Sequence, residues 1–294
     1  MTAFVSQLLL GLINGSFYAL LSLGLALIFG MLNSVNFAHG AMYMVGAFIA
    51  WMGASQLPEI TGGALSVNYW AALFAVPLVV GVLGIGFERG FLRRLRRLDP
   101  LYGMLFTFGL ALVLEGAFMN FYGAGGRPYA IPDALTGPVD IGFMMLPKYR
   151  VWVVVASLSV CLAVWYYIEK TKMGAYLRAG TENAATTQAL GVNVPLLVSL
   201  TYGLGVALAA FGGVLAAPIL QVSPRMGSEL IIVVFAVVVI GGMGSIGGAI
   251  LTGLVLGVIE GMVKMVYPQG SAIVVFVIMS IVLAVRPAGL FGRS

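Results

Sequence analysis

Charged side chains are scarce in this chain. Asp, Glu, Lys and Arg make up 9% of the 294 residues, whereas a soluble domain carries about 25%. Hydrophobic residues make up 61%, and they come in runs near the roughly 20 residues that a helix needs to span a bilayer. Runs of this length favour helices over a β-barrel. The scarcity of charge therefore excludes an ordinary soluble domain and predicts an all-α polytopic membrane protein.

Cysteine and histidine are almost absent as well. Cys161 is the single cysteine and His39 is the single histidine. One cysteine excludes a disulfide framework, and one histidine excludes a metal site built from several. The chain also contains no GxxxxGK[ST], HExxH or GxSxG sequence. We therefore predict no catalytic residue, no metal site and no cofactor bound by this chain, and we expect that it is not an enzyme.

The apolar runs predict about eight or nine membrane segments, one of them short or broken. Glycine-containing breaks occur at NSVNFAHG (33–40) and GGMGSIGG (241–248). Glycine-interrupted segments in two halves are typical of inverted-repeat transporters, in which they surround the transport path. The expected segments are 5–32, 41–55, 69–87, 101–122, 151–167, 196–220, 230–240, 249–266 and 271–285.

We predict a single transmembrane domain over residues 1–294. A first repeat covers 1–122 and a second repeat covers 195–294. Between them, 123–194 supplies an external loop, a linking span and a cytoplasmic loop. Counting crossings gives the two repeats opposite orientations, as an inverted repeat requires.

Arginine clusters set the predicted orientation. The loop ERGFLRRLRRLDP (88–100) is the most basic short loop, and the positive-inside rule places it in the cytoplasm. Lys170, Lys172 and Arg178 place the stretch after the fifth span there too, so the loop 123–149 is external, the N-terminus is external and the C-terminus is cytoplasmic. A short loop tethered to the bilayer argues against a nucleic-acid partner. The five arginines are Arg89, Arg93, Arg94, Arg96 and Arg97, and the tail adds Arg286 and Arg293.

The longest polar run of helix-forming composition is GAYLRAGTENAATTQALGVNVP (174–195). Thr181 is expected to cap the N-terminus of a short helix and Glu182 to lie in its first turn. Gly191 is expected to end the helix, and Pro195 to open the next one. A short helix is rarely stable without packing. Our hypothesis is that this helix packs against another protein at the membrane surface; the alternative is a connecting loop with one helical turn.

The two breaks supply candidates for the translocation path. At the first break, His39 is either a substrate contact or a hydrogen-bonding residue that stabilises the break. The glycines of the second break either line the path or only let helices pack closely, because Gly253–Gly257 and Gly257–Gly261 have small-xxx-small spacing. The candidate path residues are Asn36, His39, Tyr43, Gly242, Gly244 and Ser245.

Few charges fall inside the expected spans. Glu260 and Lys264 lie four residues apart, in the order that favours a helical ion pair. They are either a self-neutralised pair or a polar lining of the path. Glu115 lies toward the external end of the fourth span. Neither glutamate argues strongly for the buried carboxylate relay that an ion-coupled carrier needs.

Four stretches resemble the permeases of the branched-chain amino acid ABC importers, of the LivH type. They are GLINGSFYALLSLGLALIFGMLNSVNFAHGAMYMVGAF (11–48), TKMGAYLRAGTENAATTQALGVNV (171–194), VVVIGGMGSIGGAILTGLVLGVIE (237–260) and RPAGLFG (286–292). They occur in the order expected for the family, and the combination is much more specific than any one motif. The resemblance implies a multi-pass permease of a bacterial inner membrane that moves branched-chain amino acids inward.

The resemblance also implies partners. A second, LivM-like permease, two ABC ATPase subunits that bind ATP and Mg, and a periplasmic substrate-binding protein would complete the importer in the lipid bilayer. The stretch 171–194 is similar to the loop that docks onto the ATPase, and its ENAATTQALG part resembles the EAA…G motif, with one residue between Glu182 and the alanine pair. The residues carried over to ATPase coupling are Arg178, Thr181, Glu182, Ala184, Ala185 and Gly191.

Other functions stay open at this point. Urea, short amides and aromatic acids are alternative substrates within the same family. A permease of the ribose-type sugar importers is a rival, although NFAHG and RPAGLFG argue against it. An ion-coupled secondary transporter, with Glu115 and Glu260 as the residues to test, or a structural membrane subunit are rivals from other classes.

Overall fold

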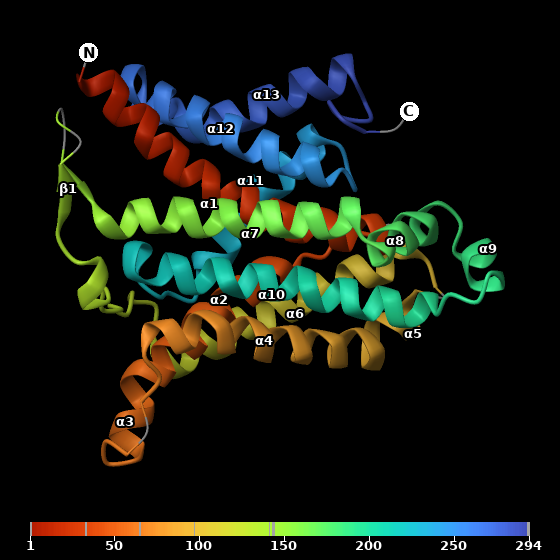
Figure 1. Cartoon of the computed structure of the whole chain (residues 1–294), viewed down its shortest axis with the longest axis horizontal. Coiled ribbons are helices and arrows are strands. Elements are labelled where there is room, and N and C mark those ends of the chain that lie inside the picture. Colours follow the sequence, from red (N-terminus) through yellow and green to blue (C-terminus); the bar gives the residue numbers. More distant parts are fainter. Residues whose placement is uncertain are drawn as a thin grey trace. The chain divides into compact units, whose positions relative to one another are not determined.

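The computed structural model describes residues 2–32, 34–64, 66–96, 98–140, 142 and 145–292. Arg97 of the basic loop and Arg293 of the tail lie outside these residues. Helices dominate the described chain (Figure 1), with one two-stranded antiparallel hairpin in the predicted external loop. The elements are α1 (Thr2–Leu32), α2 (Ala38–Trp51), α3 (Leu57–Ile60), α4 (Tyr69–Phe87), α5 (Arg93–Leu95), α6 (Pro100–Tyr122), β1 (Pro138–Asp140), β2 (Met145–Pro147), α7 (Lys148–Lys170), α8 (Lys172–Glu182), α9 (Ala184–Ala189), α10 (Val194–Leu220), α11 (Met226–Gly241), α12 (Ile246–Val266) and α13 (Ser271–Val285).

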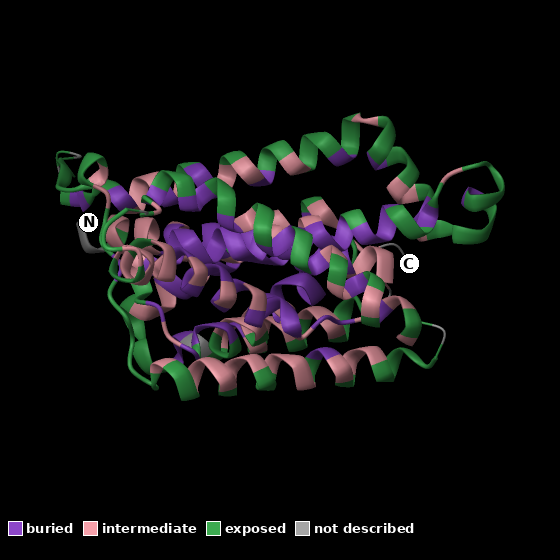
Figure 2. Ribbon diagram, turned by 90° about the horizontal axis from the view of Figure 1, so that it is seen from below, coloured by how far each residue is buried: buried purple, intermediate pink, exposed green. Residues whose placement is uncertain are grey.

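Six helices of the described chain are long and apolar enough to cross a membrane. Two further apolar helices, Met226–Gly241 and Ile273–Val285, are shorter, and α2 has 14 residues. The prediction of an all-α polytopic membrane protein with short or broken segments is confirmed. Exposed residues recur along whole helices (Figure 2). In α6, Thr107 alone is buried among the described side chains. The six long spans are Phe4–Leu32, Tyr69–Leu95, Pro100–Tyr122, Lys148–Lys170, Val194–Leu220 and Ile246–Val266.

The chain divides into two compact units. The first unit consists of Met1–Gly30, Ile131–Val192 and Val233–Ser294. The second unit consists of Met31–Ala130 and Asn193–Ile232. This division differs from the predicted repeats, which remain a prediction. Each unit combines segments from both halves of the chain, so pairing over long sequence distances holds each one together.

In the first unit, α1 and α12 approach each other through glycines. A Cβ added to Gly11 would lie 2.7 Å from the carbonyl oxygen of Gly257, and one added to Gly261 would lie 2.7 Å from the Cα of Gly11. Lipid tails are as apolar as leucine, so helices in a membrane associate largely through such close packing. The alternative that these glycines serve packing is therefore supported at Gly257 and Gly261.

In the second unit, α10 packs against both α4 and α2. A Cβ on Gly203 of α10 would lie 3.0 Å from the carbonyl oxygen of Gly81 in α4, and a Cβ on Gly46 of α2 would lie 2.5 Å from the Cα of Ala210. The first turns of α2 and α11 also meet, since a Cβ on Gly40 would lie 2.5 Å from the carbonyl oxygen of Gly227. Both short helices of the predicted repeats therefore begin at one close backbone contact.

The pairings in the two units correspond. In the predicted repeats, α1 and α10 are the first helices, and α4 and α12 are the third spans. The first helix of each repeat packs through glycine on the third span of the other, as α1 does on α12 and α10 on α4. The repeat itself stays a prediction.

We predict that Gly11→Val lowers the stability of the protein and that Gly109→Val does not. The valine at position 11 would overlap the backbone of α12, whereas position 109 in α6 has no atom within 4 Å of an added Cβ. Overpacking typically costs about 1–3 kcal/mol. The thermal unfolding midpoint of the two variants in the same detergent measures this difference, and equal midpoints would contradict the packing described here.

Candidate functional site

The predicted coupling stretch forms two short helices, α8 and α9. Thr171 caps α8 by accepting a hydrogen bond from the Gly174 amide, with 3.3 Å between Oγ1 and N. Asn183 caps α9, because its Oδ1 accepts from the Thr186 amide at 2.9 Å. The prediction that Thr181 caps the helix was wrong: Thr181 lies in α8 and donates to the Arg178 carbonyl at 2.7 Å. Glu182 consequently ends α8 instead of opening the next helix.

The end of this stretch agrees with the sequence prediction. Gly191 has a φ of 88°, the left-handed conformation that favours glycine. Its amide donates to the Gln188 carbonyl at 3.0 Å, and the Val192 amide donates to the Thr187 carbonyl at 3.3 Å. These bonds form the Schellman pattern that ends a helix. Pro195 lies in the first turn of α10, as predicted, and Asn193 caps that helix.

Residues 171–192, which we call the coupling segment, are anchored at their start to the end of α7. Gly174 is buried, and a Cβ there would overlap the Ile168 carbonyl oxygen. The Arg178 guanidinium donates to the same carbonyl, and it also pairs with Glu169 at 3.6 Å. The Ile168 carbonyl belongs to the last turn of α7, where carbonyl groups lack partners within the helix. Arg178 thus faces inward on α7, whereas Glu182, Ala184 and Ala185 are exposed.

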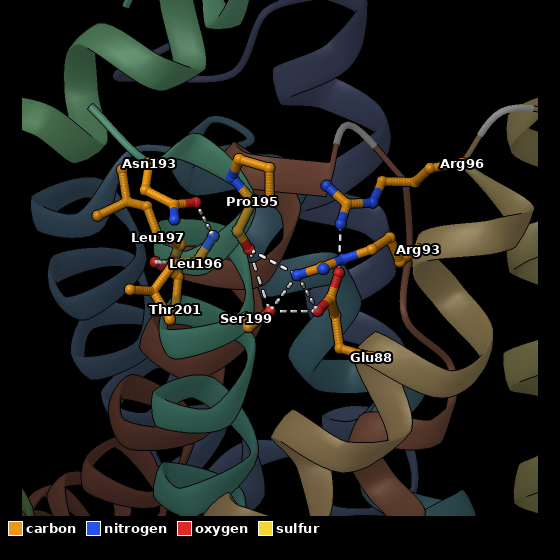
Figure 3. Close-up of polar contacts among 9 residues, drawn as sticks. All are labelled: Glu88, Arg93, Arg96, Asn193, Pro195, Leu196, Leu197, Ser199 and Thr201. Carbon is orange, nitrogen blue, oxygen red and sulfur yellow. Dashed lines mark hydrogen bonds and ion pairs between the residues drawn. The ribbon is translucent and has the colours of Figure 1, made fainter. Parts of the chain in front are cut away.

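A buried carboxylate lies beside the first turns of α10, the helix that follows the coupling segment in the chain (Figure 3). Glu88 has no exposed surface, and it accepts hydrogen bonds from the Arg96 guanidinium and from the Ser199 hydroxyl of α10. Arg93 lies 3.7 Å from the same carboxylate. The sequence reading missed this cluster because it counted the loop only as a marker of orientation. A glutamate at the end of an apolar run, followed five and eight residues later by arginines, was the available signal.

Arg93 connects this cluster to the first turn of α10. Its Nη2 donates to the Pro195 carbonyl at 3.0 Å and to the Ser199 hydroxyl at 2.9 Å. Arg89 and Arg94 of the same loop are exposed. Of the predicted cytoplasmic arginines, Arg93 therefore holds the start of α10 directly, and Arg96 pairs with the Glu88 carboxylate that Ser199 also contacts.

At the first break, Asn36 bonds to its surroundings on both sides. Its Nδ2 donates to the Tyr202 hydroxyl at 3.2 Å, and its Oδ1 accepts from the Ala38 amide at 3.2 Å. Asn36, His39 and Tyr43 are each at most 2% exposed. Asn36 thus stabilises the interruption before α2, which is the structural role that the sequence offered as the alternative for His39.

At the second break, the chain turns through Gly242 and Gly244, whose φ angles are 97° and 86°. Ser245 caps α12 by accepting from the Gly248 amide at 3.2 Å. The RPAGLFG tail returns to this break: the Leu290 amide donates to the Ile240 carbonyl at 2.8 Å, and the Phe291 amide donates to the Gly241 carbonyl at 3.3 Å. Two of the motifs quoted from the sequence therefore meet in the first unit, and the tail satisfies the end of α11.

The six candidate path residues fall into two groups. Asn36, His39 and Tyr43 belong to the second unit, and the break at 242–245 belongs to the first. Each group surrounds the predicted interruption of a short helix. Their role in a path stays a prediction.

The predicted ion pair in α12 is present. Lys264 Nζ lies 2.6 Å from Glu260, and the Tyr18 hydroxyl of α1 donates to the same carboxylate at 2.7 Å. Tyr18 was not predicted as a partner. Glu115 is half-buried in α6, and it has no hydrogen bond or ion pair in the described part of the chain. Within those residues, no group of three His, Cys, Asp or Glu side chains is arranged to hold a metal ion.

Comparison with known proteins shows the family. Residues 7–283 match the family described as the permease component of the branched-chain amino acid transport system, and the chain belongs to it. It is a permease subunit, a transport component and not an enzyme, which confirms the resemblance inferred from the motifs. No solved structure matches the chain.

Three relatives match nearly the whole chain. It is 32% identical over 297 residues to the high-affinity branched-chain amino acid transport permease BraD of Pseudomonas aeruginosa, with 99% of this chain and 96% of BraD covered. It is 30% identical over 303 residues to the permease LivH of Escherichia coli K12, with the same shares covered. It is 26% identical to a probable LivH permease of Methanocaldococcus jannaschii, with 96% of this chain and 90% of the relative covered.

We predict that Gly289→Ala loosens the tail from the second break, whereas Gly142→Ala leaves it in place. Both glycines have positive φ, 81° and 85°, so an alanine is strained equally at each, by about 1–2 kcal/mol. Only at Gly289 would the Cβ also meet neighbouring backbone, at 2.6 Å from the Val239 carbonyl oxygen. Hydrogen exchange at residues 288–292 should become faster in the first variant alone. Unchanged exchange would contradict a tail held by close backbone packing.

Proposed function

We propose that this chain is the permease of an ATP-driven ABC importer that carries branched-chain amino acids inward across a bacterial inner membrane, with its C-terminus in the cytoplasm. The observation that carries the proposal is the similarity to BraD and LivH, which are 32% and 30% identical to this chain in alignments that cover 99% of it. The similarity therefore includes the spans, the breaks and the coupling segment together. Urea, short amides and aromatic acids are the alternative solutes. The chain itself binds no cofactor, and ATP and Mg are bound by partner subunits.

The coupling segment is the proposed contact for the ATPase. Its α9 is exposed apart from the buried Thr187, and Leu190 beside it is 79% exposed. An exposed short helix fixed at both ends suits a cleft on a partner, because a short helix gains little stability by itself. Glu182, Ala184 and Ala185 are the proposed contact residues. Gly191 ends the helix, and Arg178 and Thr181 hold α8.

The other proposed partners follow from the same reading. A second, LivM-like permease forms the translocation path together with this chain. A periplasmic substrate-binding protein delivers the solute to the external loop 123–149, which carries the β1–β2 hairpin. Two ABC ATPase subunits supply the energy. The candidate path lies at the two helix breaks, at Asn36, His39 and Tyr43 and at Gly242, Gly244 and Ser245.

Replacing residues 180–191 by a flexible linker of the same length should release the ATPase from this chain while the second permease stays bound. The linker removes α9 and its caps and leaves the spans intact. A control replaces the mostly exposed residues 133–137 of the external loop in the same way. Affinity purification of the tagged chain from gently solubilised membranes, followed by mass spectrometry, measures both partners. An ATPase absent even from the unaltered chain, under conditions that preserve other ABC complexes, would falsify the importer assignment.

Uptake of labelled leucine into vesicles that contain the purified complex and its co-purifying binding protein should require ATP. An imposed proton or sodium gradient without ATP should drive no uptake, because neither Glu115 nor Glu260 argues strongly for the carboxylate relay that an ion-coupled carrier needs. Unlabelled isoleucine and valine should compete, whereas urea and phenylalanine should not. Competition by urea or phenylalanine instead would reassign the substrate, and uptake driven by the gradient would favour the ion-coupled carrier.

A further inference from the structure

We propose that Arg178 and Arg93 are positioning residues at the two sides of the coupling segment: Arg178 fastens its start to α7 in the first unit, and Arg93 fastens α10, the helix that follows it, within the second unit. Together they transmit a displacement of the segment to both units. The inference rests on the proposed function of the segment as the ATPase contact. One of the points at which the chain passes between the units falls between Val192 and Asn193. The coupling segment is therefore the covalent connection from α7 in the first unit to α10 in the second.

The first fastening lies at the junction of α7 and α8. Arg178 donates to the Ile168 carbonyl, and the missing side chain of Gly174 lets the α8 backbone reach that carbonyl. A guanidinium at a helix C-terminus is favoured by the helix dipole and satisfies a carbonyl that has no partner within the helix. The exposed pair with Glu169 adds little, since solvent screens it. A movement of α8 is thus passed to the last turn of α7.

The second fastening lies at the start of α10 (Figure 3). Arg93 donates to the Pro195 carbonyl at 3.0 Å and to Ser199 at 2.9 Å. A cation beside the N-terminal turn of a helix is opposed by the helix dipole. Glu88 compensates this charge, because its buried carboxylate pairs with Arg93 and Arg96 and accepts from Ser199. The cluster therefore holds α10 to the loop that follows α4.

In both fastenings an arginine guanidinium donates a hydrogen bond to a backbone carbonyl. This contact distinguishes them from ordinary ion pairs at the surface. A hydrogen bond from a charged donor is stronger than a neutral one, and the planar guanidinium offers several donors in fixed directions. Arg178 binds two α7 groups, and Arg93 binds two α10 groups and one carboxylate. Between these points the segment has few buried residues, so a force applied at α9 is delivered at its two ends.

The test compares R93Q and R178Q with R94Q and K172Q in the full reconstituted importer. Arg94 and Lys172 are exposed neighbours that make no ion pair or hydrogen bond in the described part of the chain. ATP hydrolysis and solute uptake are measured on the same vesicles. We expect R93Q and R178Q to keep the ATPase bound and to lower the ratio of solute transported to ATP hydrolysed by about tenfold, the order set by losing one charge-assisted hydrogen bond. R94Q and K172Q should keep the ratio of the unaltered complex.

A ratio that stays constant in R93Q and R178Q, whether both rates fall together or neither changes, overturns the inference. If the glutamine variants do not assemble, R93K and R178K decide by the same ratio, because lysine keeps the charge and loses the fixed donor directions. Failure of the proposed function has a different signature, in which the unaltered chain binds no ATPase and its uptake does not depend on ATP.

Discussion

Backbone groups at helix ends must find partners within this protein, because the hydrocarbon core of a membrane offers none. The chain meets this constraint differently at each interruption. Asn36 bonds the backbone before α2, and the tail amides of Leu290 and Phe291 bond the last carbonyls of α11. At the end of α7, which is predicted to lie on the cytoplasmic side, the Arg178 guanidinium bonds the Ile168 carbonyl in the same way. The partner is local at the first break, where Asn36 bonds an amide two residues later, and comes from the distant tail at the second.

Close backbone packing between helices is the second constraint on this fold. Helices in a membrane are not driven together by the hydrophobic effect, so they associate through van der Waals contact. Glycine increases this contact because it lets two helix backbones approach closely. The contact of Gly40 with Gly227 brings the first turns of α2 and α11 together, so the two short helices start from one point. Gly242 and Gly289 likewise allow close backbone contact at the second break, where a side chain on either residue would displace the tail.

Local signals were readable in the sequence, and long-range ones were not. Hydropathy gave the spans, and Gly191 and Pro195 marked the end of α9 and the start of α10, because these effects act within one turn. The prediction for Thr181 was wrong because α8 begins earlier, with Thr171 as its cap, so that Thr181 lies inside this helix. Asn183, two residues later, is an equally good cap and begins α9. The contact of the tail with the second break joins residues about 50 positions apart, and no local pattern encodes it. Glu88 was overlooked because the positive-inside rule treats loop charges as solvated, whereas this carboxylate is buried.

The placement of the few charges bears on where the energy for transport comes from. A carboxylate that relays protons must change its charge and its partners during the cycle. Glu260 is held by Tyr18 and Lys264, and Glu88 is held by Arg96, Arg93 and Ser199. The cations are partly exposed, whereas the carboxylates are buried, so freeing either carboxylate would leave it without its partners, and this costs more than keeping the pair. These contacts hold both carboxylates in place, which agrees with the proposal that an external ATPase, and not a proton relay, drives the permease.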